Sequence, residues 1–140
     1  MVYTEVPRKV LIVEDSPQMA ANLEIALTAV DDVEVRVAES AVEALGVLEQ
    51  GDAPDFAAIV TDLEMPHMTG FELIERLRRN PRYHSTPIIV SSGSTDPDSP
   101  AKALRLGANA YFSKPYSPSE LRKKLQRLLE ENQDRRPRDT

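Results

Sequence analysis

The sequence predicts a doubly wound α/β domain, with five parallel strands in the order 2-1-3-4-5 and helices on both faces of the sheet. Two observations carry this prediction. Short apolar runs alternate five times with segments that have one apolar helical face, as expected for βα units joined by right-handed crossovers. The apolar runs also end directly in polar or charged residues, at the strand ends where doubly wound proteins bind their ligands.

The composition narrows the range of functions. A chain of 140 residues with 41% hydrophobic and 29% charged residues is typical of one globular domain. The net charge of −6 disfavours a direct nucleic-acid partner. The absence of cysteine excludes a disulfide framework and fits a cytoplasmic protein, and no apolar run is long enough to span a membrane.

The first βα unit is signalled at each of its boundaries. The apolar run 10–13 is followed by Glu14 and Asp15 and predicts a buried strand. Ser16 then supplies a helix N-cap, and Pro17 occupies the first helical position. The apolar face of the predicted helix comprises Met19, Leu23, Ala26, Leu27 and Val30.

The second unit contains an amphipathic strand. Val33, Val35 and Val37 alternate with polar residues, so this strand is expected at the sheet edge or exposed on one face. Ser40 is the expected cap of the next helix, which ends near Gly51.

The third unit begins with the run 57–61, which stops abruptly at Asp62 and is closed by Pro66. Thr69 and Gly70 lead into the third predicted helix. Its inward residues are expected to be Phe71, Ile74 and Leu77, and its outward residues Glu72, Glu75, Arg76 and Arg78.

The last two units complete the sheet. The run 87–90 predicts the fourth strand and continues into Ser91, Ser92, Gly93 and Ser94. A short helix starting near Pro100 follows. The run 110–112 predicts the fifth strand, and the final helix begins at Ser117-Pro118. We expect the residues from Asn132 onward to form a frayed polar tail.

Four strand ends of the predicted sheet bring compatible groups to one edge. These groups are Glu14, Asp15, Asp62, Ser91 or Ser92, and Lys114. Neighbouring carboxylates repel one another unless a cation lies between them, and hard oxygen ligands favour Mg²⁺ or Mn²⁺. Lys114 offers a positive charge and Ser92 a neutral donor for phosphoryl oxygens. The set therefore predicts a site for phosphoryl transfer.

Each residue taken alone also has a structural explanation. Asp15 alone would more often be a turn or helix cap, and the Lys114-Pro115 pair would more often be an ordinary loop. The serines after the fourth strand alone would form a polar turn. The functional interpretation rests on their convergence at one edge.

Four segments in this order resemble the receiver domain of two-component response regulators, with its CheY-like, flavodoxin-like fold. They are Val10–Ser16, Thr61–Pro66, Pro87–Gly93 and Leu106–Pro115. The resemblance covers almost the whole chain. We therefore expect a receiver domain over residues 8–131, an N-terminal extension over residues 1–7 and a polar tail over residues 132–140.

The resemblance implies that Asp62 accepts a phosphoryl group from phosphohistidine on a sensor kinase or a histidine phosphotransfer protein. It implies Mg²⁺ (or Mn²⁺) ligands at Asp15, Asp62 and the backbone carbonyl of Glu64, with Glu14 contacting the metal directly or through water. Lys114 is expected to contact the phosphoryl group.

The resemblance also implies a switch. Ser92 is expected to bond the attached phosphoryl group as the Tyr111 ring turns inward. Glu64 and Ser94 are expected to tune the lifetime of the phosphorylated form. Gly93 would keep the entry open, and a cis bond before Pro115 is often found in such domains.

Three positions depart from the family pattern. Glu14 stands where aspartate is commoner, and Ser92 replaces the more frequent threonine. His67 occupies a loop position that is often glycine, and it is expected to be an exposed loop residue. None of these changes removes a functional group from the predicted site.

The leading hypothesis is a stand-alone, monomeric or weakly dimeric regulator without an output domain. Phosphorylation would switch a protein-binding face on helix four, strand five and helix five. Catalysis would be limited to self-phosphorylation and self-dephosphorylation. The alternatives are a phosphorylation-independent interaction module, a receiver fragment of a larger regulator or hybrid kinase, and an enzyme on a similar fold, such as a phosphatase or flavin carrier.

Overall fold

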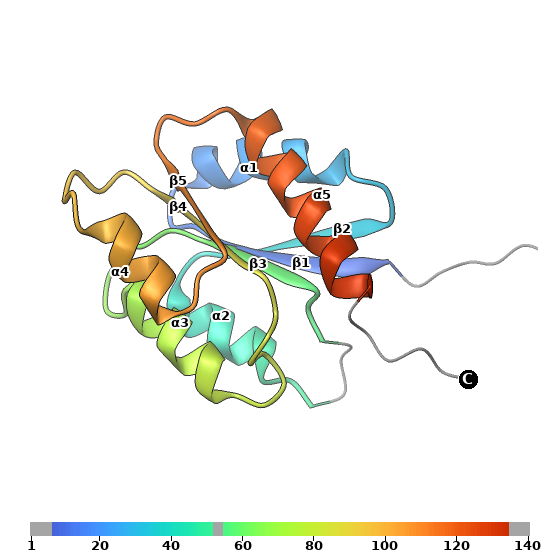
Figure 1. The fold of residues 1–140 in the computed structure, drawn as a ribbon, viewed down its shortest axis with the longest axis horizontal. Coiled ribbons are helices and arrows are strands. Elements are labelled where there is room, and N and C mark those ends of the chain that lie inside the picture. Colours follow the sequence, from blue (N-terminus) through green and yellow to red (C-terminus); the bar gives the residue numbers. More distant parts are fainter. Residues whose placement is uncertain (1–6, 52–54, 135–140) are drawn as a thin grey trace, which may run out of the picture.

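The computed structural model describes residues 7–51 and 55–134 and has the predicted doubly wound architecture (Figure 1). Five parallel strands form one sheet in the order β2-β1-β3-β4-β5, which confirms the prediction. The elements, in chain order, are β1 Arg8–Val13, α1 Pro17–Thr28, β2 Val33–Ala38, α2 Ala41–Leu48, β3 Ala58–Thr61, α3 Gly70–Arg79, β4 Ile88–Ser92, α4 Ser99–Leu106, β5 Ala110–Ser113 and α5 Pro118–Asp134.

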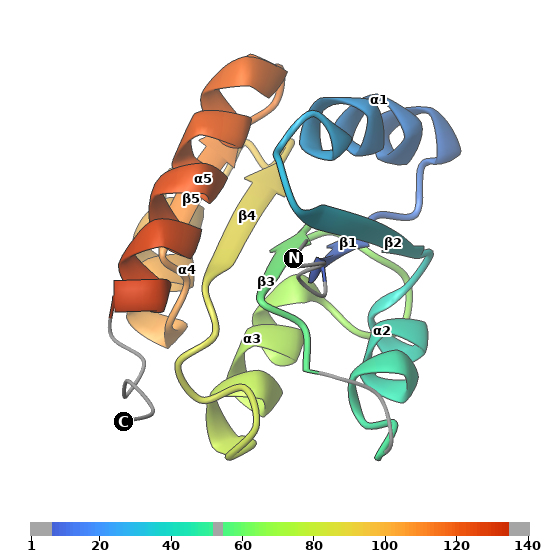
Figure 2. The same cartoon turned by 90° about the vertical axis from the view of Figure 1, so that its right-hand side faces the viewer.

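The helices cover the sheet in two layers (Figures 1 and 2). Helices α1 and α5 pack on one face, where Ile12, Val60 and Ile89 belong to the same buried cluster as Leu23 and Leu125. Helices α2, α3 and α4 pack on the other face. The cluster there includes Leu11, Ile59, Val90, Ile74 and Ala103. Successive strand residues therefore point into different cores, as strand geometry requires.

Local capping fixes where the helices begin. The Ser16 hydroxyl accepts a bond from the Met19 amide at 3.4 Å, and the Ser40 hydroxyl accepts one from the Glu43 amide at 3.0 Å. Helix α3 starts with a capping box, in which Thr69 and Glu72 satisfy each other's backbone amides. These caps set the lengths of the loops that leave the carboxyl edge of the sheet.

Strand register aligns the predicted polar residues. Val13 pairs with Thr61, and Thr61 pairs with Val90. The Asp62 amide donates to the Val13 carbonyl at 3.0 Å, so Asp62 and Glu14 follow neighbouring strands at the same level. Ser92 pairs with Ser113 of β5. The carboxyl ends of β1, β3, β4 and β5 therefore meet at one edge.

The structure corrects two details of the sequence analysis. Arg78 was expected to point outward, but it is half-buried and bonds to backbone carbonyls of other loops. Helix α5 runs to Asp134, so Asn132 lies within a helix rather than in a frayed tail. Residues 1–6 of the predicted extension and 135–140 of the predicted tail lie outside the described residues.

The two described ends of the chain lie away from the polar strand ends. Arg8 begins β1 at the amino edge of the sheet, and α5, which runs back across the sheet, ends at that edge too (Figures 1 and 2).

None of the helices in the described ranges combines the length and the apolar character needed to cross a membrane.

Candidate functional site at the carboxyl edge of the sheet

Three carboxylates converge at the ends of β1 and β3. Glu14, Asp15 and Asp62 each offer an oxygen that lies within 4.8 Å of the others. Glu14 and Asp62 are buried, with 5% and 6% of their surfaces exposed, while Asp15 is exposed. Buried carboxylates this close together require compensating positive charge.

The Asp62 carboxylate is held by its own loop and by a lysine. Its Oδ1 atom accepts bonds from the amides of Leu63 and Glu64 at 2.7 and 3.3 Å. Its Oδ2 atom lies 3.3 Å from the Nζ atom of Lys114. The side chain thus has a fixed orientation, with one oxygen directed toward a positive charge.

Lys114 bridges the two buried acids. Its Nζ atom donates to Glu14 Oε1 at 2.8 Å as well as to Asp62. Burial by itself lowers the pKa of Lys114, but the hydrogen bond with Glu14 and the charge of Asp62 outweigh this effect, so the pKa lies above its ordinary value. Lys114 therefore stays charged at neutral pH and offsets part of the acidic charge.

Glu14 is the least water-exposed of the three acids. Burial raises the pKa of its carboxyl above the ordinary value. The hydrogen bonds from Lys114 and from the Ser16 amide, which is 3.1 Å from Oε2, only partly offset this effect. The longer glutamate arm at this position still places its carboxylate in the acidic cluster.

Gly70 closes the loop that follows Asp62. Its amide donates to the Leu63 carbonyl at 2.9 Å. A Cβ atom at this position would overlap the Asp62 carbonyl oxygen and the Leu63 backbone. Only glycine lets the start of α3 approach so closely, so Gly70 keeps the Asp62 loop compact.

Ser92 and Tyr111 lie on neighbouring strands. Ser92 is fully buried, and its hydroxyl accepts a bond from the Ser94 amide at 3.0 Å. Tyr111 is half-buried and packs against the cluster under α3 and α4. Ser94 is half-buried, and its hydroxyl lies 2.9 Å from that of Ser99.

The remaining predicted residues surround this centre. Glu64 and His67 are exposed in the loop after Asp62, and His67 has a positive φ of 72°, a conformation that glycine adopts more easily. A Cβ atom added at Gly93 would lie 3.9 Å from the Lys114 side chain, so space is open there. The bond between Lys114 and Pro115 is cis, as expected.

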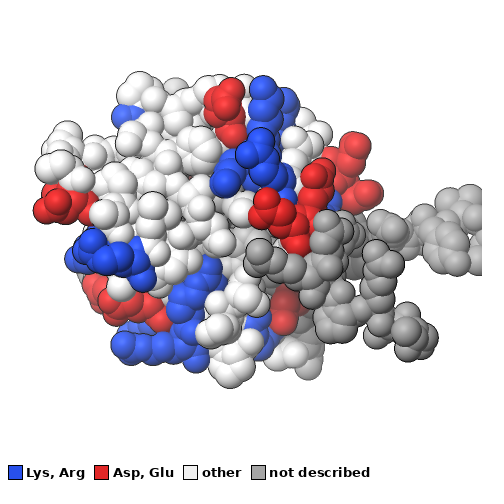
Figure 3. Space-filling model, in the orientation of Figure 1, with Lys and Arg blue, Asp and Glu red and all other residues white. Residues whose placement is uncertain are grey.

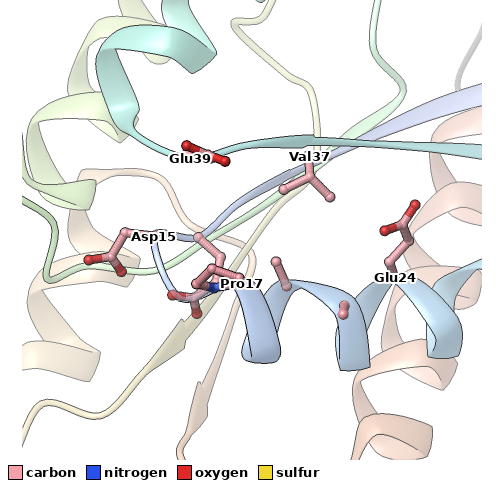
Figure 4. A pocket seen from close by; sticks show the side chains of 8 residues that line it. Asp15, Pro17, Glu24, Val37 and Glu39 are labelled. Atoms are coloured by element: carbon pink, nitrogen blue, oxygen red, sulfur yellow. The ribbon is translucent and has the colours of Figure 1, made fainter.

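A pocket of about 220 Å³ opens beside the acidic groups, between α1 and the end of β2 (Figure 4). Glu39 lies across this pocket from Asp15 and Pro17. Glu14 and Glu24 also line it, together with Ala20, Ala21 and Val37. The acidic lining favours the approach of cations from this side.

The sequence matches the model of the response regulator receiver domain over residues 10–126. The chain belongs to the response regulator receiver domain family. A chemotaxis protein CheY homolog from Campylobacter jejuni is 34% identical over 121 residues, which cover 86% of this chain and 92% of that protein.

Solved receiver structures share the fold. A CheY-like receiver domain protein from Methanospirillum hungatei has a TM-score of 0.81 at 26% identity, covering 91% of this chain and 98% of that one. The phosphorylated cyanobacterial phytochrome response regulator RcpA has a TM-score of 0.75 at 25% identity, covering 89% and 92% of the two chains. This receiver domain is thus a CheY-like module of two-component signalling rather than a classical enzyme.

The carboxylates of this receiver domain fit a divalent cation. Three oxygens within 4.8 Å of one another can share one ion, and an all-oxygen donor set suits Mg²⁺ or Mn²⁺. Asp15 is exposed, so water can complete the coordination of such an ion.

Sequence reasoning missed two residues near the centre of this receiver domain. Tyr116 is half-buried, burial raises the pKa of its phenol, and the charges of Lys114, Glu14 and Asp62 act on it. Ser99 is buried and contacts Ser94. Neither position had a pattern of its own, because both approach the site only through the folding of loops.

Proposed function

We propose that this receiver domain is phosphorylated on Asp62 by a phosphohistidine of a sensor histidine kinase or a histidine phosphotransfer protein. One observation carries the proposal. Asp62 is a buried carboxylate that two backbone amides orient and that faces the charged Lys114 within an acidic cluster. This arrangement supplies a positioned nucleophile and a cation for phosphoryl oxygens, which are the main requirements of phosphoryl transfer.

A carboxylate oxygen of Asp62 attacks the phosphorus atom and forms a P–O bond as the P–N bond of the donor breaks. The donor imidazole keeps the electron pair of that bond and takes up a proton. Lys114 bonds a phosphoryl oxygen, and Leu63 and Glu64 keep the other Asp62 oxygen in place through their amides. Hydrolysis of the acyl phosphate restores Asp62.

Glu14, Asp15, Asp62 and the backbone carbonyl of Glu64 would hold Mg²⁺ or Mn²⁺, which supplies neutralisation of the phosphoryl charge when bound. The acidic cluster supports this assignment. Self-phosphorylation from small donors and self-dephosphorylation would be the only reactions catalysed.

We further propose that Ser92 bonds the attached phosphoryl group and that Tyr111 follows it inward, which biases a two-state equilibrium. The output surface would comprise α4, β5 and α5. In Figure 3 an uncharged area extends over β5 between the Lys and Arg side chains of α4 and α5, which suits a downstream protein target. Glu64 and Ser94 would tune the phosphoryl lifetime, and the module would act in the cytoplasm.

The test compares Asp62→Asn with a control variant, Asp31→Asn. Asp31 is an exposed aspartate on a distant loop. Wild type and the control are incubated with acetyl phosphate and Mg²⁺ and should gain the mass of one phosphoryl group. Asp62→Asn should gain none, and its circular dichroism spectrum should remain that of the folded wild type. Equal phosphorylation of Asp62→Asn would refute the assignment, and an unmodified wild type would favour a phosphorylation-independent interaction module.

A further inference from the structure

A chain of hydrogen bonds links the end of β4 to the first turn of α4. The Ser94 amide donates to the Ser92 hydroxyl at 3.0 Å. The Ser94 hydroxyl and the Ser99 hydroxyl are 2.9 Å apart, and the Asp96 amide donates to the Ser94 hydroxyl at 3.2 Å. Ser94 therefore connects a residue of the candidate site with the first residue of a helix.

The hydroxyls at both ends of this hydrogen-bond chain are buried, so breaking the hydrogen bonds costs free energy. Ser92 has no exposed surface and Ser99 is only 5% exposed. Buried hydroxyls are stable only when they are hydrogen-bonded, and a lost partner costs more than the bond itself contributes. The backbone amide of Ser99 is already used, since it donates to the Asp96 carbonyl at 3.1 Å. The Ser99 side chain bonds separately, because its hydroxyl is paired with the Ser94 hydroxyl.

We propose that Ser99 is a positioning residue for Ser92 and acts through Ser94. In the present arrangement, Ser99 fixes the Ser94 loop so that the Ser94 amide donates a hydrogen bond to the Ser92 hydroxyl. The inference rests on the proposed function, in which the Ser92 hydroxyl turns to a phosphoryl group on Asp62. That turn breaks the bond to Ser94 and releases the bond between Ser94 and Ser99.

The two ends of α4 differ in how they are held. At the carboxyl end, the carbonyl of Gly107 accepts bonds from Arg78 Nε and Nη2 at 3.1 and 2.7 Å. At the amino end, the serine chain connects the helix to Ser92. Release of this chain therefore acts on the first turn of α4, while the last turn stays bound to α3.

The direction of the effect follows from linkage. A hydrogen bond that forms only in the unphosphorylated arrangement stabilises that arrangement, and its free energy is lost when the domain changes to the phosphorylated arrangement. Removing the Ser99 hydroxyl removes this stabilisation of the unphosphorylated arrangement, so a phosphoryl mimic should bind more tightly. The loss of one such bond corresponds to an affinity gain of about fivefold.

The experiment titrates the full chain with beryllofluoride at saturating Mg²⁺ and follows binding by amide NMR. Ser99→Ala should bind about fivefold more tightly than wild type, whereas Ser99→Thr, which keeps the hydroxyl, should stay within about twofold. Ser85→Ala, which removes an exposed hydroxyl elsewhere, should match wild type. In a Ser94→Ala background, Ser99→Ala should have no further effect, because the intermediary is gone.

A purely structural role for Ser99 gives a different pattern. It would change the free energy of unfolding but leave beryllofluoride affinity unchanged, or it would act equally in the Ser94→Ala background, and either result would overturn the inference. If Ser99→Ala does not fold, Ser94→Ala alone must bind more tightly than wild type for the inference to stand. Failure of wild type to bind beryllofluoride at all would contradict the proposed function itself.

Discussion

Lys114 is the residue on which the charge balance of the site depends. Its ammonium group lies 2.8 Å from one buried carboxylate and 3.3 Å from another. It therefore neutralises part of the negative charge that a divalent cation bound to the same acids would neutralise. The lysine and the cation both neutralise Glu14 and Asp62, so the presence of one lowers the affinity of the acids for the other.

We expect Lys114→Ala to bind Mg²⁺ about tenfold more tightly than wild type, because a competing positive charge is removed from the acids. Isothermal titration calorimetry with MgCl₂ measures this change. Phosphorylation of the same variant by acetyl phosphate should nevertheless become slower, since the phosphoryl oxygens lose their cation.

Lys123→Ala is the matched control, because Lys123 is an exposed lysine on α5. Its Mg²⁺ affinity should remain within about twofold of wild type. Weaker Mg²⁺ binding by Lys114→Ala than by this control would show that Lys114 organises the acids rather than competing for them.

Residue types at strand ends were predictable from the sequence because the signal is local. Apolar runs stop at Glu14, Asp62 and Ser92, and the parallel arrangement brings such ends together. The hydrogen bonds around them were not predictable. The contact of Lys114 with Glu14 joins residues 100 positions apart, and its geometry depends on two loops that no sequence pattern specifies.

At the scale of elements, α3 and the start of β5 are joined by Arg78. Its guanidinium donates hydrogen bonds to the carbonyls of Gly107 and Tyr83 and to the side chain of Asn109. The same Asn109 side chain also accepts a hydrogen bond from the Ile88 amide. Burial lowers the pKa of Arg78. Helical spacing alone assigned Arg78 to the solvent face, because the carbonyl that binds it comes from a loop 29 residues away.

We expect Arg78→Ala to lower the free energy of unfolding by about 2 kcal/mol, since two carbonyls lose charged donors in a half-buried setting. Urea denaturation followed by circular dichroism measures the change. Arg79→Ala, which removes an exposed arginine from the same helix, should alter stability by no more than about 0.5 kcal/mol. Equal effects of the two substitutions would mean that Arg78 contributes only general helix propensity.

At the scale of the whole molecule, the sheet separates two cores that share the same strands. Ile12 of β1 is buried under α1 and α5, and Ile59 of β3 is buried under α2 and α3. Because adjacent residues of each strand enter different cores, neither layer can lose its packing without affecting the strands that support the other. The domain should therefore unfold as one cooperative unit.

We expect Ile12→Val and Ile59→Val each to lower the free energy of unfolding by about 1 kcal/mol. The double variant should lose the sum of the two values, since the side chains belong to separate buried clusters on opposite faces of the sheet. Far-ultraviolet circular dichroism and tyrosine fluorescence should report one coincident transition in every variant. Separate transitions for the two signals would indicate that the layers unfold independently.

The separation of the chain ends from the polar edge has a practical consequence for measurement. The chain contains no cysteine, so a Glu131→Cys substitution on an exposed position near the end of α5 would create a single thiol. A fluorophore or a sensor surface coupled there would lie at the amino edge of the sheet, and the acidic cluster at the opposite, carboxyl edge would remain accessible to the solution. Donor proteins could then be passed over the tethered domain and compared one by one without a bulky label beside the acids.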